Sequence, residues 1–139
     1  MTTVTFDTSF YIGALNSRGA GSRLLEMARA GEIRADISEP IIRETLRVLR
    51  ERFAWDGNRI NQLRQALSRM ANQVVPAQTL HVIKEDPADN RILECAAEAQ
   101  SDYIVTWDND LLRLEQFGKA RIVTPVALLR MLNGVPGAG

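Results

Sequence analysis

Short apolar stretches alternate with longer amphipathic stretches along the chain. Runs rich in β-forming residues and bounded by turn residues predict five strands, at 3–7, 33–37, 73–75, 103–106 and 121–123. Apolar residues that recur every three or four positions predict helices at 23–30, 39–53, 59–71, 89–99 and 125–132. Because strands alternate with helices, we predict an α/β fold whose central parallel sheet is covered by helices on both faces.

Residues at the expected helix ends agree with this division. Ser22 is a candidate N-cap for the helix 23–30, and Gly31 is a candidate C-terminal stop. Ser38 precedes the helix 39–53, which carries Pro40 in its first turn. Glu44 lies at the margin of the apolar face of that helix, so we expect its carboxylate to point inward or toward a rim.

The composition is that of a globular protein: of 139 residues, 45% are hydrophobic and 24% are charged. We predict a single domain at 1–132, followed by a flexible C-terminal tail at 133–139. No apolar run approaches the roughly 20 residues of a membrane span, and the first residues lack the basic region of a signal peptide. The single cysteine, Cys95, lies among small apolar residues, so we expect a core residue in a protein of the reducing cytoplasm.

The balance of charge limits the possible partners. The chain has 17 basic and 17 acidic residues and a net charge of zero, which excludes the strongly basic surface of general nucleic-acid-binding proteins. If nucleic acid binds, local arginines or a bound metal must attract it. The segment GAGS at 19–22 lacks the lysine and the spacing of a phosphate-binding P-loop.

Carboxylates follow the ends of predicted strands. The candidate site residues are Asp7, Glu44, Asp89, Asp108 and Asp110. In open α/β sheets, ligand sites form beyond the carboxyl ends of the strands, so these acids are expected to converge. Crowded carboxylates repel one another unless one is protonated or a cation intervenes. Oxygen ligands without Cys or His select hard ions, so the set predicts a site for Mg²⁺ or Mn²⁺. With His81 as the only histidine, Ser-His-Asp and zinc sites are not expected.

Four motifs in order resemble those of the PIN-domain ribonucleases, best known as the toxin components of VapBC-type toxin–antitoxin pairs. They are D-T-S at 7–9, S-E-P-x-x-x-E at 38–44, D-P-x-D-N at 86–90 and D-Y-I-V-T-W-D-N-D-L at 102–111. The sequence R-I-V-T-P at 121–125 is similar to the closing strand of the family. Each motif alone is weak, but four in this order cover nearly the whole chain.

The resemblance implies a three-layer PIN-like fold with strand order 3-2-1-4-5, often as a homodimer. It implies that Asp7, Glu44, Asp89 and Asp108 form the acidic quartet of a metal-dependent endoribonuclease, that Asp110 is an additional metal ligand, and that three polar residues support the site: Ser9, Asn90 and Thr106. The expected cofactor is Mg²⁺ or Mn²⁺ and the expected substrate is RNA. A cognate antitoxin is an expected protein partner.

Two alternatives belong to other functional classes. A phospho-acceptor receiver domain also gathers acids at strand ends, but it needs an aspartate ending the third strand and a lysine ending the fifth. Val75-Pro76 and Thr124-Pro125 stand at these places. The other alternative is a PIN-like binding module that acts through a protein partner with little nuclease activity. The arginines of helix 39–53 fit either function, or a solvated helix face: Arg43, Arg47 and Arg50.

Overall fold

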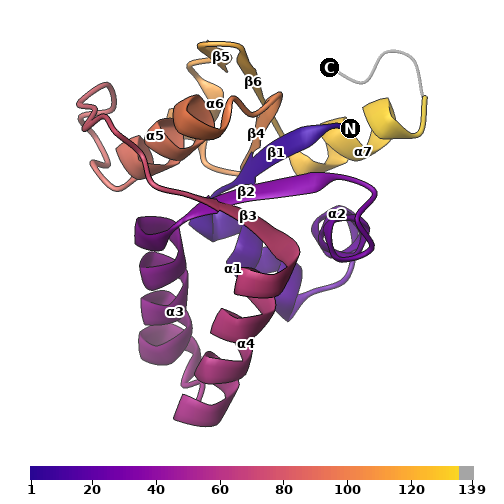
Figure 1. Cartoon of the computed structure of the whole chain (residues 1–139), viewed down its shortest axis with the longest axis vertical. Coiled ribbons are helices and arrows are strands. Elements are labelled where there is room, and N and C mark those ends of the chain that lie inside the picture. Colours follow the sequence, from indigo (N-terminus) through magenta and orange to yellow (C-terminus); the bar gives the residue numbers. More distant parts are fainter. Residues whose placement is uncertain (135–139) are drawn as a thin grey trace.

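The computed structural model describes residues 1–134. A six-stranded sheet runs through the centre with the order β3-β2-β1-β4-β6-β5, and helices cover both of its faces (Figure 1). The strands are β1 Thr3–Phe6, β2 Arg34–Ser38, β3 Ala71–Val74, β4 Tyr103–Val105, β5 Gln116–Phe117 and β6 Ala120–Val123. The helices are α1 Thr8–Asn16, α2 Ala20–Arg29, α3 Glu39–Phe53, α4 Gly57–Met70, α5 Asp89–Ala99, α6 Asn109–Leu112 and α7 Pro125–Leu132. Residues 135–139 lie outside the described residues, and so does most of the tail predicted at 133–139.

The predicted fold class and strand order are confirmed, with one added strand. The five predicted strands correspond to β1, β2, β3, β4 and β6, and all of their pairings are parallel. The sixth strand, β5, pairs antiparallel with β6 at the edge of the sheet, across a turn where Gly118 has a φ of 59°. The pattern of the sequence could not reveal β5, because two residues are too few to show an alternation of polar and apolar positions.

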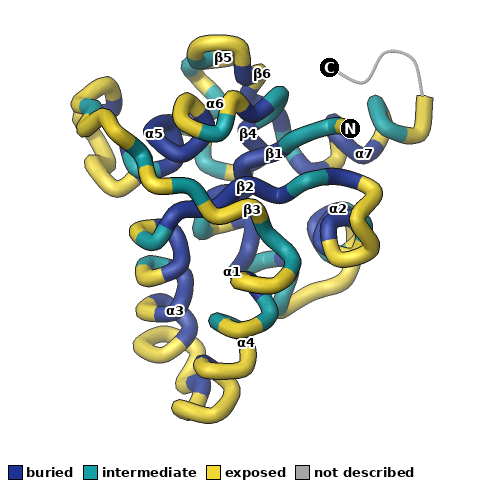
Figure 2. Tube along the Cα trace, in the orientation of Figure 1, coloured by how far each residue is buried: buried dark blue, intermediate teal, exposed yellow. Residues whose placement is uncertain are grey.

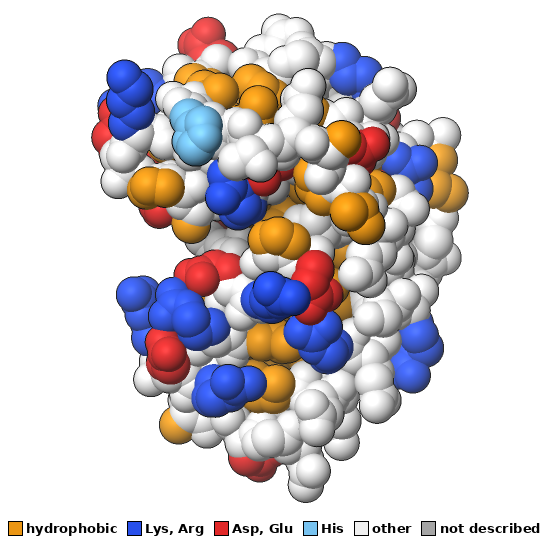
Figure 3. Space-filling model, turned by 60° about the vertical axis from the view of Figure 1, so that its left-hand side comes forward, with side chains coloured by type: hydrophobic (Ala, Val, Ile, Leu, Met, Phe, Trp, Pro, Cys, Tyr) orange, Lys and Arg blue, Asp and Glu red, His pale blue; other side chains and the backbone are white. Residues whose placement is uncertain are grey.

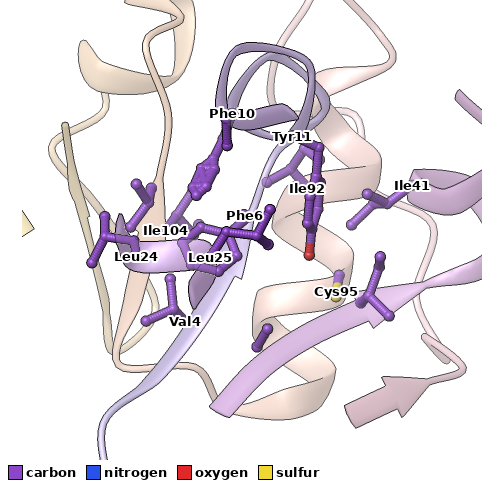
Figure 4. Packing of buried hydrophobic residues seen from close by; sticks show 14 of the residues in the cluster. Val4, Phe6, Phe10, Tyr11, Leu24, Leu25, Ile41, Ile92, Cys95 and Ile104 are labelled. Atoms are coloured by element: carbon purple, nitrogen blue, oxygen red, sulfur yellow. The ribbon is translucent and has the colours of Figure 1, made fainter. Parts of the chain in front are cut away.

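Alternate residues of β1 face the two helical layers. Val4 and Phe6 lie on the side of α1 and α2 (Figure 4). The Thr5 hydroxyl faces the other layer, 2.7 Å from Ser101 Oγ and 3.8 Å from Cys95 Sγ of α5. The ring of Phe6 stacks on that of Phe10 in α1, with centroids 3.9 Å apart. The central strands β1 and β4 are largely buried, whereas the edge strand β3 is partly exposed (Figure 2). This packing fixes the start of α1 against the end of β1.

The helix ends agree with the sequence in most places. The helices α5 and α7 have the predicted bounds, and Gly31 follows the end of α2 with a φ of 79°. The predicted Ser22 cap is wrong, because α2 begins at Ala20 with Gly19 at its N-cap. Ser38 does precede α3, but its hydroxyl is buried and makes no hydrogen bond with the described residues. Within residues 1–134, no helix combines the length and the hydropathy that crossing a membrane requires.

The segment 75–88 docks on α5 instead of forming a strand. Three side chains of α5, four residues apart, accept hydrogen bonds from its backbone. The pairs are Asn90 with the Ile83 N–H at 2.9 Å, Glu94 with the Leu80 N–H at 2.7 Å and Glu98 with the Ala77 N–H at 2.8 Å. Residues four apart lie on one face of a helix, so one polar stripe of α5 holds the whole segment.

The ring of Trp107 closes over two helices at the end of β4. It stacks on Phe10 with centroids 5.9 Å apart, although its residue is 43% exposed. A Cβ atom built on Gly13 would lie 2.8 Å from Trp107 Cζ3, and one on Gly21 would lie 2.9 Å from Trp107 Cη2. The two glycines therefore make room for the ring, which anchors the chain just before Asp108.

We predict that Gly13→Ala destabilises the protein only while Trp107 is present. Overpacking a filled site costs typically ~1–3 kcal/mol, which exceeds the helix-propensity gain of about 1 kcal/mol that alanine brings. In a Trp107→Ala background, the same substitution should raise the free energy of unfolding. Urea denaturation of the four proteins of this cycle measures the coupling. Equal effects of Gly13→Ala in both backgrounds would contradict the contact.

Candidate metal centre

A cleft of about 570 Å³ opens between α3 and α5, beyond the carboxyl ends of β1 and β4. Its five acidic lining residues come from four parts of the chain: Asp7, Glu44, Asp86 with Asp89, and Asp108. Its walls are apolar and include Ile12, Val48 and Ile92. Figure 3 shows the hollow between the two halves of the molecule, with acidic and basic side chains at its mouth. The structure thus brings four of the five predicted acids to one cleft.

Asp7 lies at the base of the cleft and is 3% exposed. It directly follows β1 and is the N-cap of α1, where its Oδ1 accepts the Phe10 N–H at 2.8 Å. The hydroxyl of Ser9 donates to the same carboxylate at 2.9 Å, and the hydroxyl of Thr106 donates to its Oδ2. The predicted supporting residues Ser9 and Thr106 therefore hold the Asp7 carboxylate in place.

Thr106 also positions Asp108. While the Thr106 hydroxyl donates to Asp7, its oxygen accepts the backbone N–H of Asp108 at 2.8 Å. Asp108 then begins α6, and its Oδ1 accepts the Asp110 N–H at 2.8 Å. One threonine thus links the acid that follows β1 to the acid that follows β4.

Three carboxylates form the tightest group in the cleft. Asp86, Asp89 and Asp108 each offer a ligand atom, and these atoms lie within 4.8 Å of one another. Asp89 is 7% exposed, and its Oδ2 is buried without a hydrogen-bond partner among the described residues. A buried oxygen without a donor is costly unless a proton or a cation satisfies it.

The pKa values of the buried acids show how costly the crowding is. Burial raises the pKa of Asp89 from 3.8 to about 8, and the closeness and charge of Asp108, together with the charges of Asp86 and Asp7, add to the shift. Burial also raises the pKa of Asp7 to about 6, against the lowering effect of its donors Thr106, Phe10 and Ser9. Asp89 therefore retains its proton at neutral pH, and a hard divalent cation bound to it and its neighbours would displace that proton.

Glu44 lines the cleft, but an arginine holds its carboxylate. Arg47 donates to both of its oxygens, at 2.6 and 3.1 Å, and pairs with Glu51 at 2.5 Å. The hydrogen bond from Arg47 lowers the pKa of Glu44. Glu44 therefore does not belong to the tight group, because Arg47 already neutralises its carboxylate.

The remaining predicted residues lie at the periphery. Asp110 is outside the residues that line the cleft, and its carboxylate pairs with Arg113. Asn90 is buried, and its amide bonds both the N–H and the carbonyl of Ile83, at 2.9 and 2.8 Å. Asn90 thus anchors the segment that carries Asp86 and does not itself line the cleft.

Sequence reasoning missed Asp86 and two arginines of the cleft. Asp86 belongs to the motif at 86–90, but its position directly before Pro87 is typical of a turn residue and does not indicate a place beside Asp89. Arg52 and Arg91 also line the cleft, so its walls carry positive charge although the motifs do not. The one available signal was the position of Arg52, eight residues or about two helical turns after Glu44.

An α/β sheet that gathers carboxylates beyond two adjacent strands is compatible with a divalent-metal site in the cleft. In agreement, residues 3–110 match the family model of the PIN domain. The match covers more than half of the chain, which therefore belongs to the PIN domain family. PIN domains are typically metal-dependent nucleases, and the three-carboxylate group is compatible with that chemistry. No curated protein matches the chain.

We predict that Asp89→Asn stabilises the metal-free protein. The raised pKa of Asp89 means that the native state binds more protons than the unfolded chain. The wild-type free energy of unfolding should then fall as the pH rises from 3.8 through about 8, and the variant, which cannot ionise here, should escape this loss. A gain of about 1 kcal/mol at neutral pH would raise Tm by roughly 3–5 °C.

Melting curves in EDTA at several pH values measure this effect. Asp56→Asn is the matched control, because Asp56 caps α4 outside the cleft and asparagine can keep that cap. In millimolar Mg²⁺ or Mn²⁺ the order should reverse, since the wild type gains more binding energy. An Asp89→Asn protein no more stable than wild type in EDTA would show that the carboxylates do not crowd one another.

Proposed function

We propose that the chain is an endoribonuclease that depends on Mg²⁺ or Mn²⁺ and acts as the toxin of a toxin–antitoxin pair. The observation that carries the proposal is the convergence of Asp7, Asp86, Asp89 and Asp108 in one cleft, from the buried Asp7 to the exposed Asp86. The buried, unpartnered Oδ2 of Asp89 supports a bound cation in particular. All of the donor atoms are carboxylate oxygens, which favours a hard ion.

In this proposal Asp89 and Asp108 hold the ion, and Asp7 completes the site from below. A bound Mg²⁺ or Mn²⁺ would polarise the scissile phosphate and activate the attacking water. Asp7 keeps Thr106 in place, and Thr106 orients the backbone of Asp108, so the carboxylates are arranged before substrate arrives. Glu44 can reach the ion only after its carboxylate leaves Arg47. Asp110 would join in only if its ion pair with Arg113 opened.

The walls of the cleft suit a single-stranded RNA substrate. Arg52 can bind phosphate oxygens, because guanidinium groups pair well with phosphates, whereas Arg91 is already paired with Glu94 at 2.7 Å. The apolar surface of Ile12, Val48 and Phe53 offers contact to a base or ribose. Because acids outnumber arginines in the cleft, a bound cation together with Arg52 would have to attract the RNA.

The partners follow from the resemblance to VapBC-type toxins. We propose a cognate antitoxin that occupies the same cleft, and a homodimer of the toxin. The alternative is a PIN-like module that acts through a protein partner without cleaving RNA. Folded protein that binds the metal but cleaves no RNA would favour this alternative.

Cleavage should depend on Asp108 and not on Asp102. The two aspartates flank β4, and Asp102 lies at its other end, where its carboxylate accepts the Thr3 N–H at 3.0 Å and pairs with Lys119 at 3.3 Å. Asp108→Asn should abolish metal-dependent RNA cleavage, whereas Asp102→Asn should retain it. A gel assay with labelled single-stranded RNA tests both. Equal loss in two folded variants would refute the assignment of the site.

Mg²⁺ or Mn²⁺ should restore activity after EDTA treatment, and Zn²⁺ should not. The reason is the ligand set, which consists of oxygen atoms without a Cys or His in the cleft. The same RNA assay with each ion added in turn provides the measurement. Full restoration by Zn²⁺ alone would count against a hard-ion site.

A further inference from the structure

We propose that Asp86 is a direct ligand of the cation, together with Asp89 and Asp108. The inference deepens the proposed function and rests on its metal site. It adds a residue outside the quartet that the sequence resemblance implies, and it makes the segment 75–88 part of the metal centre. The geometry that points to it is the three-carboxylate group, whose ligand atoms lie within 4.8 Å of one another.

The unpartnered oxygen of Asp89 shows where a ligand is missing. Asp89 is only 7% exposed, yet its Oδ2 has no hydrogen-bond donor among the described residues. The neighbouring acids differ in this respect. Asp7 accepts hydrogen bonds on both oxygens, from Ser9, Phe10 and Thr106, and both oxygens of Glu44 are held by Arg47. The carboxylate oxygens left for a cation are therefore those around Asp89.

Asp86 is held so that it can fill this place. Its Oδ1 accepts the Ala88 N–H at 3.2 Å, and its backbone carbonyl accepts the Asp89 N–H at 3.0 Å. Among the described residues, no other group donates to its carboxylate, and no arginine or lysine forms an ion pair with it. Upstream, the bonds between Asn90 and Ile83 fix the segment on α5. Several hydrogen bonds thus hold the charged side chain of Asp86 close to those of Asp89 and Asp108.

A purely structural role for Asp86 makes a different prediction. If Asp86 only closes the turn at 86–89, asparagine can replace it, because the amide oxygen accepts the Ala88 N–H equally well. As a cation ligand, however, asparagine lacks the negative charge that Asp86 adds to those of Asp89 and Asp108. Asp86→Asn therefore separates the two roles. Asp86→Ser is a second variant that also keeps a local acceptor and removes the charge.

The matched control is the adjacent acid. Glu85 is exposed, and it is not among the residues that line the cleft. Glu85→Gln removes the same charge one position away, so it measures the long-range electrostatic effect alone. Melting curves in EDTA establish that each variant is folded before metal is added.

A titration of the full chain with Mn²⁺ tests the proposal without any assay of activity. Binding is measured by calorimetry and by the electron paramagnetic resonance signal of free Mn²⁺. Asp86→Asn should weaken Mn²⁺ binding by about ten-fold or more, since even residues that only support a metal ligand change affinity by about that factor. Glu85→Gln should change it by less than about two-fold, because Glu85, although as exposed to solvent as Asp86, does not line the cleft and acts only through a screened charge.

The outcomes distinguish this inference from the proposed function. Wild-type affinity in Asp86→Asn and Asp86→Ser, with binding lost in Asp89→Asn, would overturn the role of Asp86 and leave the metal site intact. Equal weakening in Asp86→Asn and Glu85→Gln would also overturn it, because a distant charge would then explain the effect. A wild-type protein that binds no Mn²⁺ would overturn the metal site itself.

Discussion

The buried carboxylate of Asp7 is the contact on which the site depends. It lies where β1 ends and α1 begins, and it binds the Thr106 hydroxyl at the end of β4. Because β1 and β4 are parallel neighbours, their ends are already adjacent, and the Asp7–Thr106 bond makes this adjacency specific. Without the donors at Ser9, Phe10 and Thr106, a carboxylate this deeply buried would be strongly disfavoured. The same donors therefore stabilise the fold and aim the next acid, Asp108, into the cleft.

The five predicted acids fall into groups according to their local structure. Glu44 and Asp110 each have an arginine three residues later, Arg47 and Arg113, and both are neutralised by an ion pair. Asp7 and Asp108 each accept a backbone N–H in place of an arginine, whereas Asp89 has no donor for its Oδ2 among the described residues. Charge at the rim is thus compensated within the chain, while the three-carboxylate group is left for a proton or a cation. This division concentrates affinity for a metal at one end of the cleft.

The strand order could be predicted only from the resemblance to the PIN-domain ribonucleases, because the pattern of apolar residues does not say which strands are neighbours. The periodicity of apolar residues predicted the bounds of α5 and α7. The two-residue β5 and the start of α2 at Ala20 carry no periodic signal of that kind. The spacing of three residues between Glu44 and Arg47 is that of a helical ion pair, whereas the resemblance implies that Glu44 is a metal ligand. The structure shows the ion pair.

The polar stripe of α5 explains why Asp86 was hard to recognise. Sequence patterns indicate which face of a helix is apolar, but not which segment packs on its polar face. On α5 that polar face, with Asn90, Glu94 and Glu98, binds the backbone of the segment 75–88. In the sequence alone, three polar residues at a spacing of four are indistinguishable from a solvated helix face. Only the structure shows that the backbone of the segment 75–88 donates to them. Two of the three are buried, Asn90 and Glu94, which a solvated face would not require. The helix that contributes Asp89 thus also fixes the segment that contributes Asp86. The separation of these two carboxylates is consequently set within one local unit, independently of how the sheet positions Asp108.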